Sequence, residues 1–267
     1  MKNLVRFLTF VFCITVNAQT EIKKEYYPNG QLKYEIPYKD GLKNGVATEY
    51  YENGKPKIVE TNSNGKLNGS FVEYYENGVV KNELTYKEDK ANGIFKTYYE
   101  SGELLGEVKF VENEKTGIET GYYEDGNLKY ISPYLNNQIN GIHTEYFDTG
   151  QPKFTVNFTD GKKNGVQKFY LFTGELEYEL PYVDDKISGI AKEYYLSGKI
   201  KTQENYINDI RNGLSQKYYE NGQLKSETTY KDDKVVGEIK DYYENGTPKT
   251  AIIINYDENG EKKWFLN

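Results

Sequence analysis

The sequence has almost none of the residues from which catalytic and metal centres are usually built. Its 267 residues include one cysteine, Cys13, one histidine, His143, and one tryptophan, Trp264. A single cysteine excludes an intrachain disulfide, and one histidine with one cysteine cannot supply the ligands of a zinc site. The composition therefore predicts a protein without a metal or a cofactor, stabilised by packing alone.

Long apolar runs are also scarce. Hydrophobic residues make up only 37% of the chain, which is too little for a large aliphatic core. The one extended apolar run, 7–16, follows two basic residues and ends in Val16-Asn17-Ala18. This pattern predicts a secretory signal peptide over residues 1–18. The run is too short to span a bilayer, so no integral membrane segment is expected after cleavage.

The alternative to simple cleavage is a lipoprotein signal that uses Cys13. Phe12 occupies the position where such a signal needs a small residue, and Cys13 lies inside the apolar run, so cleavage after Ala18 is favoured. The remaining chain then has no cysteine, which suits an oxidising compartment. We expect an exported protein, periplasmic or extracellular, with association with the cell envelope as one option.

Clustered positive charge is the next absence. Without residues 1–18 the chain has 32 Lys and Arg against 41 Asp and Glu, a formal charge of −9, and lysines alternate with acids. Binding to phosphates requires grouped basic residues, so nucleic acid is excluded as a partner, and anionic membrane surfaces are disfavoured.

Glycine, in contrast, is abundant and strictly spaced. Nine glycines run from Gly45 to Gly237 at intervals of 24 residues, and ten more share that interval. A fixed period of this length means one supersecondary unit copied head to tail. The spacing predicts a single array over 19–251 whose ten hairpin glycines are Gly30, Gly54, Gly78, Gly102, Gly126, Gly150, Gly174, Gly198, Gly222 and Gly246.

Each unit reads as strand, turn, strand and loop. In the first unit the turn is Pro28-Asn29-Gly30, and Pro28 favours a type I turn with glycine in the left-handed region. Such a three-residue loop places Tyr26 opposite Leu32 and Glu25 opposite Lys33. Glu or Asp faces Lys at these two positions in six of the ten units, which supports the register.

Alternation along the two strands then assigns their faces. It places Tyr26, Leu32, Tyr34, Ile36 and Tyr38 on one apolar face, and it places the charged residues with the second tyrosine of each Tyr-Tyr pair on the other. No second sheet or helix is available to cover the apolar face. The prediction is an all-β, elongated, coiled antiparallel meander of ten tandem 24-residue hairpins.

The last residues leave the period. Residues 252–267 contain an apolar run, a turn at Asn259-Gly260 and the sole tryptophan. Terminal units of an array must hide an exposed strand edge, so this segment is interpreted as a C-terminal capping hairpin with Trp264 over the last unit.

The repeated motif resembles a known family. The segment Tyr218-Tyr219-Glu220-Asn221-Gly222-Gln223-Leu224-Lys225-Ser226-Glu227, and its copies along nearly the whole array, are similar to the MORN-variant repeat of bacterial proteins. The resemblance implies antiparallel sheet modules that act as scaffolds or binding surfaces. It also implies the label YwqK-like antitoxin, which many such chains carry.

Candidate chemical sites all have simpler explanations. His143 occupies a repeat position held elsewhere by residues such as Ala47 and Phe71, so it is a variable strand residue and not a placed base. The acidic loops 183–186 and 231–234 each carry a lysine beside the carboxylates, which favours structural turns over calcium sites. We therefore expect no enzyme activity.

Two functions remain. The first is an exported, non-catalytic binding or scaffold module for an extended partner, an unidentified protein or glycan; the second is an antitoxin-like inhibitor that captures one specific toxin protein. The first function predicts a binding row of regularly spaced aromatic side chains. The alternative is that these side chains only shield the backbone and the lysine stems from water. The candidate row is Tyr27, Tyr51, Tyr75, Tyr99, Tyr123, Tyr195, Tyr219 and Tyr243.

Overall fold

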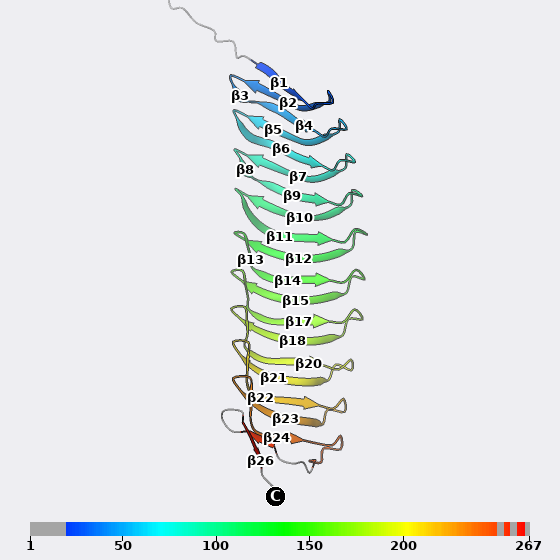
Figure 1. Cartoon of the computed structure of the whole chain (residues 1–267), viewed down its shortest axis with the longest axis vertical. Coiled ribbons are helices and arrows are strands. Elements are labelled where there is room, and N and C mark those ends of the chain that lie inside the picture. The colour runs from blue at the N-terminus through cyan, green and yellow to red at the C-terminus, as the bar shows by residue number, and fades with distance from the viewer. Residues whose placement is uncertain (1–19, 250–253, 257–260, 265–267) are drawn as a thin grey trace, which may run out of the picture.

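The computed structural model describes residues 20–249, 254–256 and 261–264, and every regular element among them is a strand (Figure 1). No helix in these ranges is long and apolar enough to cross a membrane. The strands are β1 (Thr20–Tyr26), β2 (Leu32–Lys39), β3 (Leu42–Lys43), β4 (Gly45–Tyr50), β5 (Pro56–Ser63), β6 (Lys66–Tyr74), β7 (Val80–Lys87), β8 (Lys90–Ala91), β9 (Gly93–Tyr98), β10 (Leu104–Val111), β11 (Glu114–Tyr122), β12 (Leu128–Leu135), β13 (Gln138–Ile139), β14 (Gly141–Tyr146), β15 (Pro152–Thr159), β16 (Lys162–Lys163), β17 (Gly165–Tyr170), β18 (Leu176–Val183), β19 (Lys186–Ile187), β20 (Gly189–Tyr194), β21 (Ile200–Ile207), β22 (Ile210–Tyr218), β23 (Leu224–Lys231), β24 (Lys234–Asp241), β25 (Ile254–Tyr256) and β26 (Lys262–Trp264).

The strands pair antiparallel in chain order, except that each short strand and the strand after it, such as β3 and β4, both pair with the preceding strand; the result is one long open sheet. Figure 1 shows the hairpin loops along one edge of this sheet and the remaining turns along the other edge, from the N-terminal to the C-terminal repeat. The all-β, elongated meander of tandem hairpins predicted from the sequence is confirmed. Among the described residues, the main contacts join strands that are adjacent in the sheet, and no second layer of described strands covers either face.

The ends of the array fall largely outside the described residues. The predicted signal peptide, 1–18, lies wholly outside them. Of the predicted capping segment, 252–267, the structure describes β25 and β26, which pair with each other, and β25 also pairs with β24. The backbone of Trp264 is therefore placed in a terminal strand.

The hairpin loop has the predicted three residues. In the first unit the amide of Tyr27 donates to Gln31 O over 2.8 Å, and the amide of Gly30 donates to Tyr27 O over 2.9 Å. Gly30 has φ +86°, and the side chain of Asn29 accepts the amide of Gln31. This left-handed position is the reason for the glycine grid, because a β-carbon there is strained.

In nine of the ten hairpins the strand after the loop contains a β-bulge that the sequence does not predict. Tyr26 lies opposite Leu32 as predicted, but Glu25 lies opposite Tyr34 instead of Lys33, which is the extra residue. Lys33 Nζ nevertheless lies 3.0 Å from Glu25 Oε1. The bulge lets the side chain of Lys33 point to the same face of the sheet as that of Glu25. The predicted contact between Glu25 and Lys33 is confirmed, but the predicted strand register is wrong by one residue.

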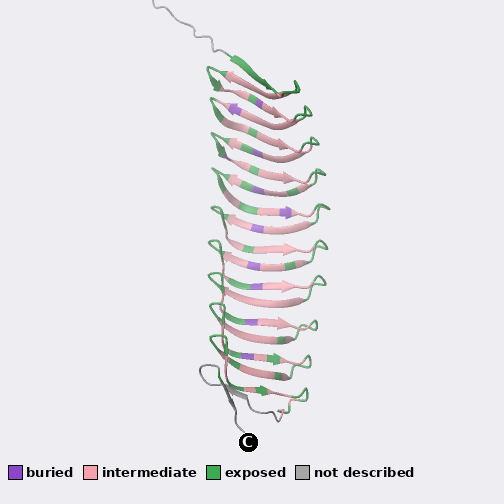
Figure 2. Cartoon of the chain, viewed as in Figure 1, coloured by how far each residue is buried: buried purple, intermediate pink, exposed green. Residues whose placement is uncertain are grey.

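The bulge also corrects the assignment of the two faces. Tyr34, Ile36 and Tyr38 share a face with Glu25 and its equivalents, and Tyr26 and Leu32 lie on the opposite face. We call the first the inner face, because the buried residues Ala47, Val108, Val156 and Ala191 lie on it, near the middle of the strands (Figure 2). The opposite face is the outer face.

The inner face is less apolar than predicted. Its central row also contains the buried polar residues Ser132, Gln167 and Ser215, and a fourth, Asn62, lies near the end of β5 on the same face. Each has a side-chain partner on the same face; Gln167, for example, accepts a hydrogen bond from Lys163 Nζ over 3.1 Å. Paired polar groups can be buried at little net cost, so the row tolerates them.

The acidic loops are tight turns that connect repeats. Asp184 and Asp185 have φ +47° and +68°, which is a type I′ turn. The carboxylate of Asp185 accepts the amide of Lys163 in the preceding repeat over 2.8 Å, and the amide of Asp185 donates to Lys163 O. Among the described residues no group of acids and histidines could hold a metal ion. The aspartates thus serve the junction between repeats.

Candidate functional site

The tyrosines of the predicted binding row all stand at the start of a hairpin loop. In seven of them the phenol hydroxyl donates a hydrogen bond of 2.6–2.9 Å to a backbone carbonyl of the following repeat. We call this row of bonds the tyrosine seam. Its members are Tyr27, Tyr51, Tyr75, Tyr99, Tyr123, Tyr195 and Tyr219.

The seam satisfies carbonyls that the sheet leaves unpaired. The pairing of β2 with β4 ends at Tyr34 and Glu49, so the carbonyl of Tyr50 lies just beyond the ladder. The hydroxyl of Tyr27 reaches this carbonyl over 2.7 Å. A half-buried carbonyl without a partner is costly, so each tyrosine stabilises the junction between two repeats.

The rings of these tyrosines are half-buried on the inner face, and lysines lie over several of them. Lys129 Nζ is 5.5 Å from the ring centroid of Tyr123, and Lys225 Nζ is 5.5 Å from that of Tyr219. Tyr243, after which the chain leaves the 24-residue period, is 54% exposed. The row therefore has a structural role, and its role in binding stays a prediction.

A hollow on the inner face marks the point where two facing residues are glycines. Gly106 lies opposite Gly121, at positions where three other repeats carry a tyrosine opposite a glutamate and the rest carry other side chains. The cavity between them measures about 290 Å³ and is lined by Phe95, Val108, Tyr130 and others. A β-carbon on Gly121 would overlap the ring of Tyr130, so this glycine lets the ring lie against the backbone.

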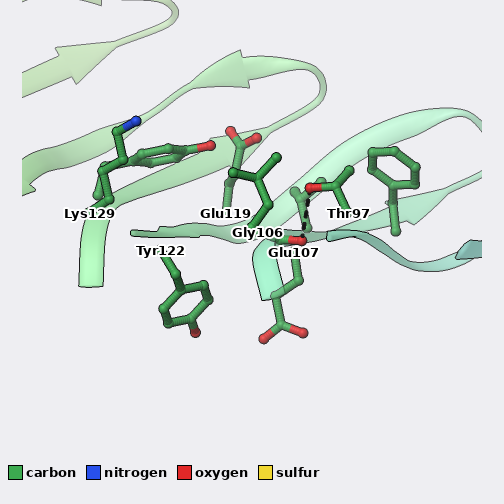
Figure 3. A pocket seen from close by; sticks show the side chains of 10 residues that line it. Thr97, Gly106, Glu107, Glu119, Tyr122 and Lys129 are labelled. Carbon is green, nitrogen blue, oxygen red and sulfur yellow. Dashed lines mark hydrogen bonds between the residues drawn. The ribbon is translucent and has the colours of Figure 1, made fainter. Parts of the chain in front are cut away.

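Figure 3 shows that the side chains around this hollow point to opposite faces of the sheet. Thr97, Glu119 and Lys129 point to one side of the strands, and Glu107 and Tyr122 point to the other. The carboxylate of Glu119 is held by Lys115 Nζ at 3.0 Å. The inner wall thus offers a hydroxyl, a carboxylate and an ammonium group beside apolar side chains. We call this hollow the glycine notch.

Two further hollows repeat one another six units apart. The cavity of about 160 Å³ beside Ala47 and the cavity of about 180 Å³ beside Ala191 are lined by residues at equivalent repeat positions, including Glu60 in the first and Glu204 in the second. At the same repeat position the two repeats after Ala47 carry Phe71 and Phe95, and the repeats on either side of Ala191 carry Gln167 and Ser215. We call them the alanine notches. The sequence shows both alanines, but only the structure places them on the inner face.

His143 is part of the packing of this face. Its Nδ1 lies 2.6 Å from Ser132 Oγ, and its ring centroid is 5.5 Å from that of Phe154 and 6.2 Å from that of Tyr130. Burial lowers the pKa of His143, so the ring is neutral at pH 7. This environment agrees with its interpretation as a variable strand residue.

Four tyrosines should make the fold sensitive to alkali. Burial, followed by interactions with nearby glutamates, raises the pKa of Tyr98, Tyr134, Tyr194 and Tyr206 to about 12. Since the folded pKa lies above the unfolded value of about 10, their contribution to stability is complete below pH 10 and is lost as the pH rises through 12. We expect tyrosinate absorbance and loss of the circular dichroism signal to rise together in this window. Titration of all tyrosines near pH 10 with the sheet intact would contradict it.

Comparisons with known proteins identify the repeat. The family model of the MORN repeat variant matches residues 22–40, 43–61, 67–88, 91–112, 115–136, 139–160, 163–184, 187–208 and 211–232, which is well over half of the chain. None of the curated proteins matches. One similar solved structure is the crystal structure of TcdB2-TccC3, at 12% identity and a TM-score of 0.22, covering 91% of this chain but only 16% of that one. Repeats of the matched family are generally non-catalytic binding modules. The match covers nine of the ten hairpins, and the chain therefore belongs to the MORN repeat variant family.

Proposed function

We propose that this protein is an exported, non-catalytic binding or scaffold module for an extended partner, either a polypeptide or a glycan. The observation that carries the proposal is the series of three hollows on one face of an elongated sheet: the two alanine notches and the glycine notch between them. A partner that follows the sheet could place one group in each hollow.

The size and spacing of the hollows favour an extended partner over a small free ligand. The cavities of about 160, 180 and 290 Å³ are each below the usual range for drug-sized ligands, which begins at about 300 Å³. Six repeats of two strands at about 4.8 Å separate the alanine notches by about 58 Å. Weak contacts at several such points gain affinity by multivalency.

The tyrosine seam borders the same face. Its half-buried rings and the lysines above them add polar and aromatic contacts beside the notches. We therefore keep the tyrosine row as part of the proposed surface, with the hydroxyls committed to the fold and the rings and the lysines over them forming its border. The predicted export, by a signal peptide over residues 1–18, suits a glycan or protein of the cell envelope.

A second candidate function is inhibition of one specific toxin protein. It is favoured by the single occurrence of the glycine notch, which is a local departure from the repeat and suits one compact epitope. An export signal is at odds with neutralising a cytoplasmic toxin, so we rank this function second.

Filling the notches tests the first function. Ala47→Phe with Ala191→Phe introduces the residue that Phe71 and Phe95 already provide at the same repeat position, so the fold should persist. We expect capture of partners from an envelope extract to fall at least fivefold. Leu196→Phe, on an exposed hairpin loop, adds the same ring elsewhere and should capture normally.

The outcome separates the two functions. Capture that survives the alanine double variant but is lost in Thr97→Tyr, which fills the glycine notch, would favour the single-epitope inhibitor. Undiminished capture by both variants, each shown to be folded by circular dichroism, would remove the inner face as the binding surface.

A further inference from the structure

The outer face carries a row of exposed aliphatic side chains that the proposed function does not use. One repeat position, on the first strand of each hairpin, holds a β-branched residue or leucine in eight units. Most of these side chains are about half exposed; Ile118 is 60% exposed and Ile142 is 61% exposed. The row consists of Ile22, Val46, Ile94, Ile118, Ile142, Val166, Ile190 and Leu214.

A second row lies beside the first in the middle of the array. Ile118 pairs with Pro133, and Leu135 follows two residues later on the same strand, so its side chain shares the outer face. The equivalent residues Val111, Val183 and Ile207 are also exposed, each by 40% or more. We call the two rows together, from Val111 to Leu214, the aliphatic band.

The band runs along the sheet without turning away. Figure 1 shows the hairpin loops on one edge and the other turns on the opposite edge in every repeat, so equivalent residues stay in line over the array. On the strands between, the row members face Pro133, Asn157, Pro181 and Asn205 in turn, so the row is interrupted by two asparagines. A row of this many exposed aliphatic side chains still marks an interaction surface.

We propose that the aliphatic band is the interface with a second copy of this chain, which packs face to face along it. The spacing decides the occupant. Successive aliphatic residues in a row stand two strands, or about 9.6 Å, apart, whereas an extended polypeptide presents side chains to one side every 6.4–6.8 Å. The side chains of an extended peptide therefore match the band only at every second repeat, after about 19 Å, and miss the repeat between. Another copy has the same period and stays in register over the whole band.

The charges beside the band are compatible with self-association. Lys168 and Lys192 lie on the outer face at 3.5 and 3.7 Å from the carboxylate of Glu179, and Lys240 lies 3.7 Å from Glu227. These lysines and glutamates neutralise one another within each copy. The outer faces of two copies therefore do not repel each other, although the chain as a whole is acidic. The same acidity disfavours an anionic membrane as the occupant.

The exposed area fits a reversible dimer. A whole aliphatic side chain corresponds to about 60–120 Å² at the usual transfer free energy per area. Nine half-exposed side chains therefore offer roughly 300–500 Å² per copy, and the prolines and charged stems at the margins add to this. A standard interface buries about 800 Å² per partner. We expect a dimer with a micromolar dissociation constant.

Analytical ultracentrifugation of the purified chain between about 1 and 200 μM tests this proposal. We expect the mass to approach twice that of the chain at the upper end. Ile118→Thr with Ile142→Thr keeps β-branched residues in the strands and should weaken dimerisation at least tenfold. Phe172→Thr with Leu196→Thr removes equally exposed apolar side chains from the hairpin loops and should leave dimerisation unchanged.

Solution scattering at the same concentrations gives the geometry. A face-to-face dimer keeps the maximum dimension of the monomer and gains cross-section, while an end-to-end dimer doubles the length. A monomer at every concentration, a dimer that the Ile118/Ile142 variant leaves intact, or a doubled length would each overturn the proposal. So would a monomer that floats with phosphatidylcholine vesicles and loses this binding in the same variant, which would assign the band to a membrane.

Discussion

Replacing Tyr75, Tyr99 and Tyr123 together by phenylalanine is expected to lower the free energy of unfolding of the array by about 3 kcal/mol. Each substitution removes one hydroxyl of the tyrosine seam and leaves a carbonyl of the next repeat without its donor. A hydrogen bond contributes about 1 kcal/mol net, and an orphaned acceptor can cost more. Because the rings remain, packing is preserved. Urea unfolding followed by circular dichroism measures the loss.

The chain contains its own controls for this prediction. Tyr243 is 54% exposed and the chain leaves the 24-residue period after it, so Tyr243→Phe should change stability by less than about 0.5 kcal/mol. Phe147 occupies the seam position without a hydroxyl, and Phe147→Tyr should stabilise the array by about 1 kcal/mol through a new bond to the next repeat. If the triple variant unfolds like the wild type, the seam bonds do not hold the repeats together.

The seam also determines how the binding hypothesis should be tested. Serine substitutions at these tyrosines would remove ring and hydroxyl together, so a loss of capture could reflect loosened repeats. The phenylalanine variants separate the two effects. Capture that persists in a destabilised phenylalanine variant would assign the hydroxyls to the fold and the rings to the partner.

The period and the hairpin could be predicted because each depends on residues close together in the chain. Gly30 and its equivalents need a left-handed backbone, and Asn29 before it favours the turn, so loop length and its position follow from local chemistry. The I′ turns at the other edge depend in the same way on residues such as Asp184 and Asp185. The family match agrees with this local reading.

The two faces could not be assigned because a single extra residue reverses them. Alternation assumes that every residue after the loop advances the strand, but Lys33 bulges out and shifts all later side chains by one. A useful signal was present in the recurring pairs of Glu and Lys, since both a regular register and a bulge bring these charges together. The pairs therefore could not distinguish the two registers.

The candidate site was hidden for the same reason. Ala47 and Ala191 are visible as small residues in the sequence, but they form hollows only because their position faces the half-buried side of the sheet. The aliphatic rows are equally visible as a 24-residue recurrence of Ile and Val. Without the bulge, nothing indicates that they are exposed.

Gly106→Val is expected to destabilise the array by about 2–3 kcal/mol, although Gly106 lies off the 24-residue grid and has no left-handed φ. A β-carbon there would lie 2.8 Å from the carbonyl oxygen of Thr120. That oxygen belongs to the backbone of a neighbouring strand, so relief requires the two strands to move apart, and overpacking of this kind costs 1–3 kcal/mol or more. From sequence alone this glycine would be expected to tolerate valine better than Gly222.

The matched control is Ser226→Val. Ser226 occupies the same repeat position in a later hairpin, where other units carry Ile58, Thr202 or an aromatic residue, so a β-branched side chain fits and stability should change by less than about 0.5 kcal/mol. Urea unfolding of both variants, together with Gly222→Val, ranks the three sites by their loss of unfolding free energy. Gly222→Val serves as the case in which valine is strained by a φ of +92°. If Gly106→Val matches Ser226→Val, the strands at the glycine notch can separate freely. The notch would then be an adaptable hollow, and a partner group larger than its cavity of about 290 Å³ could still enter it.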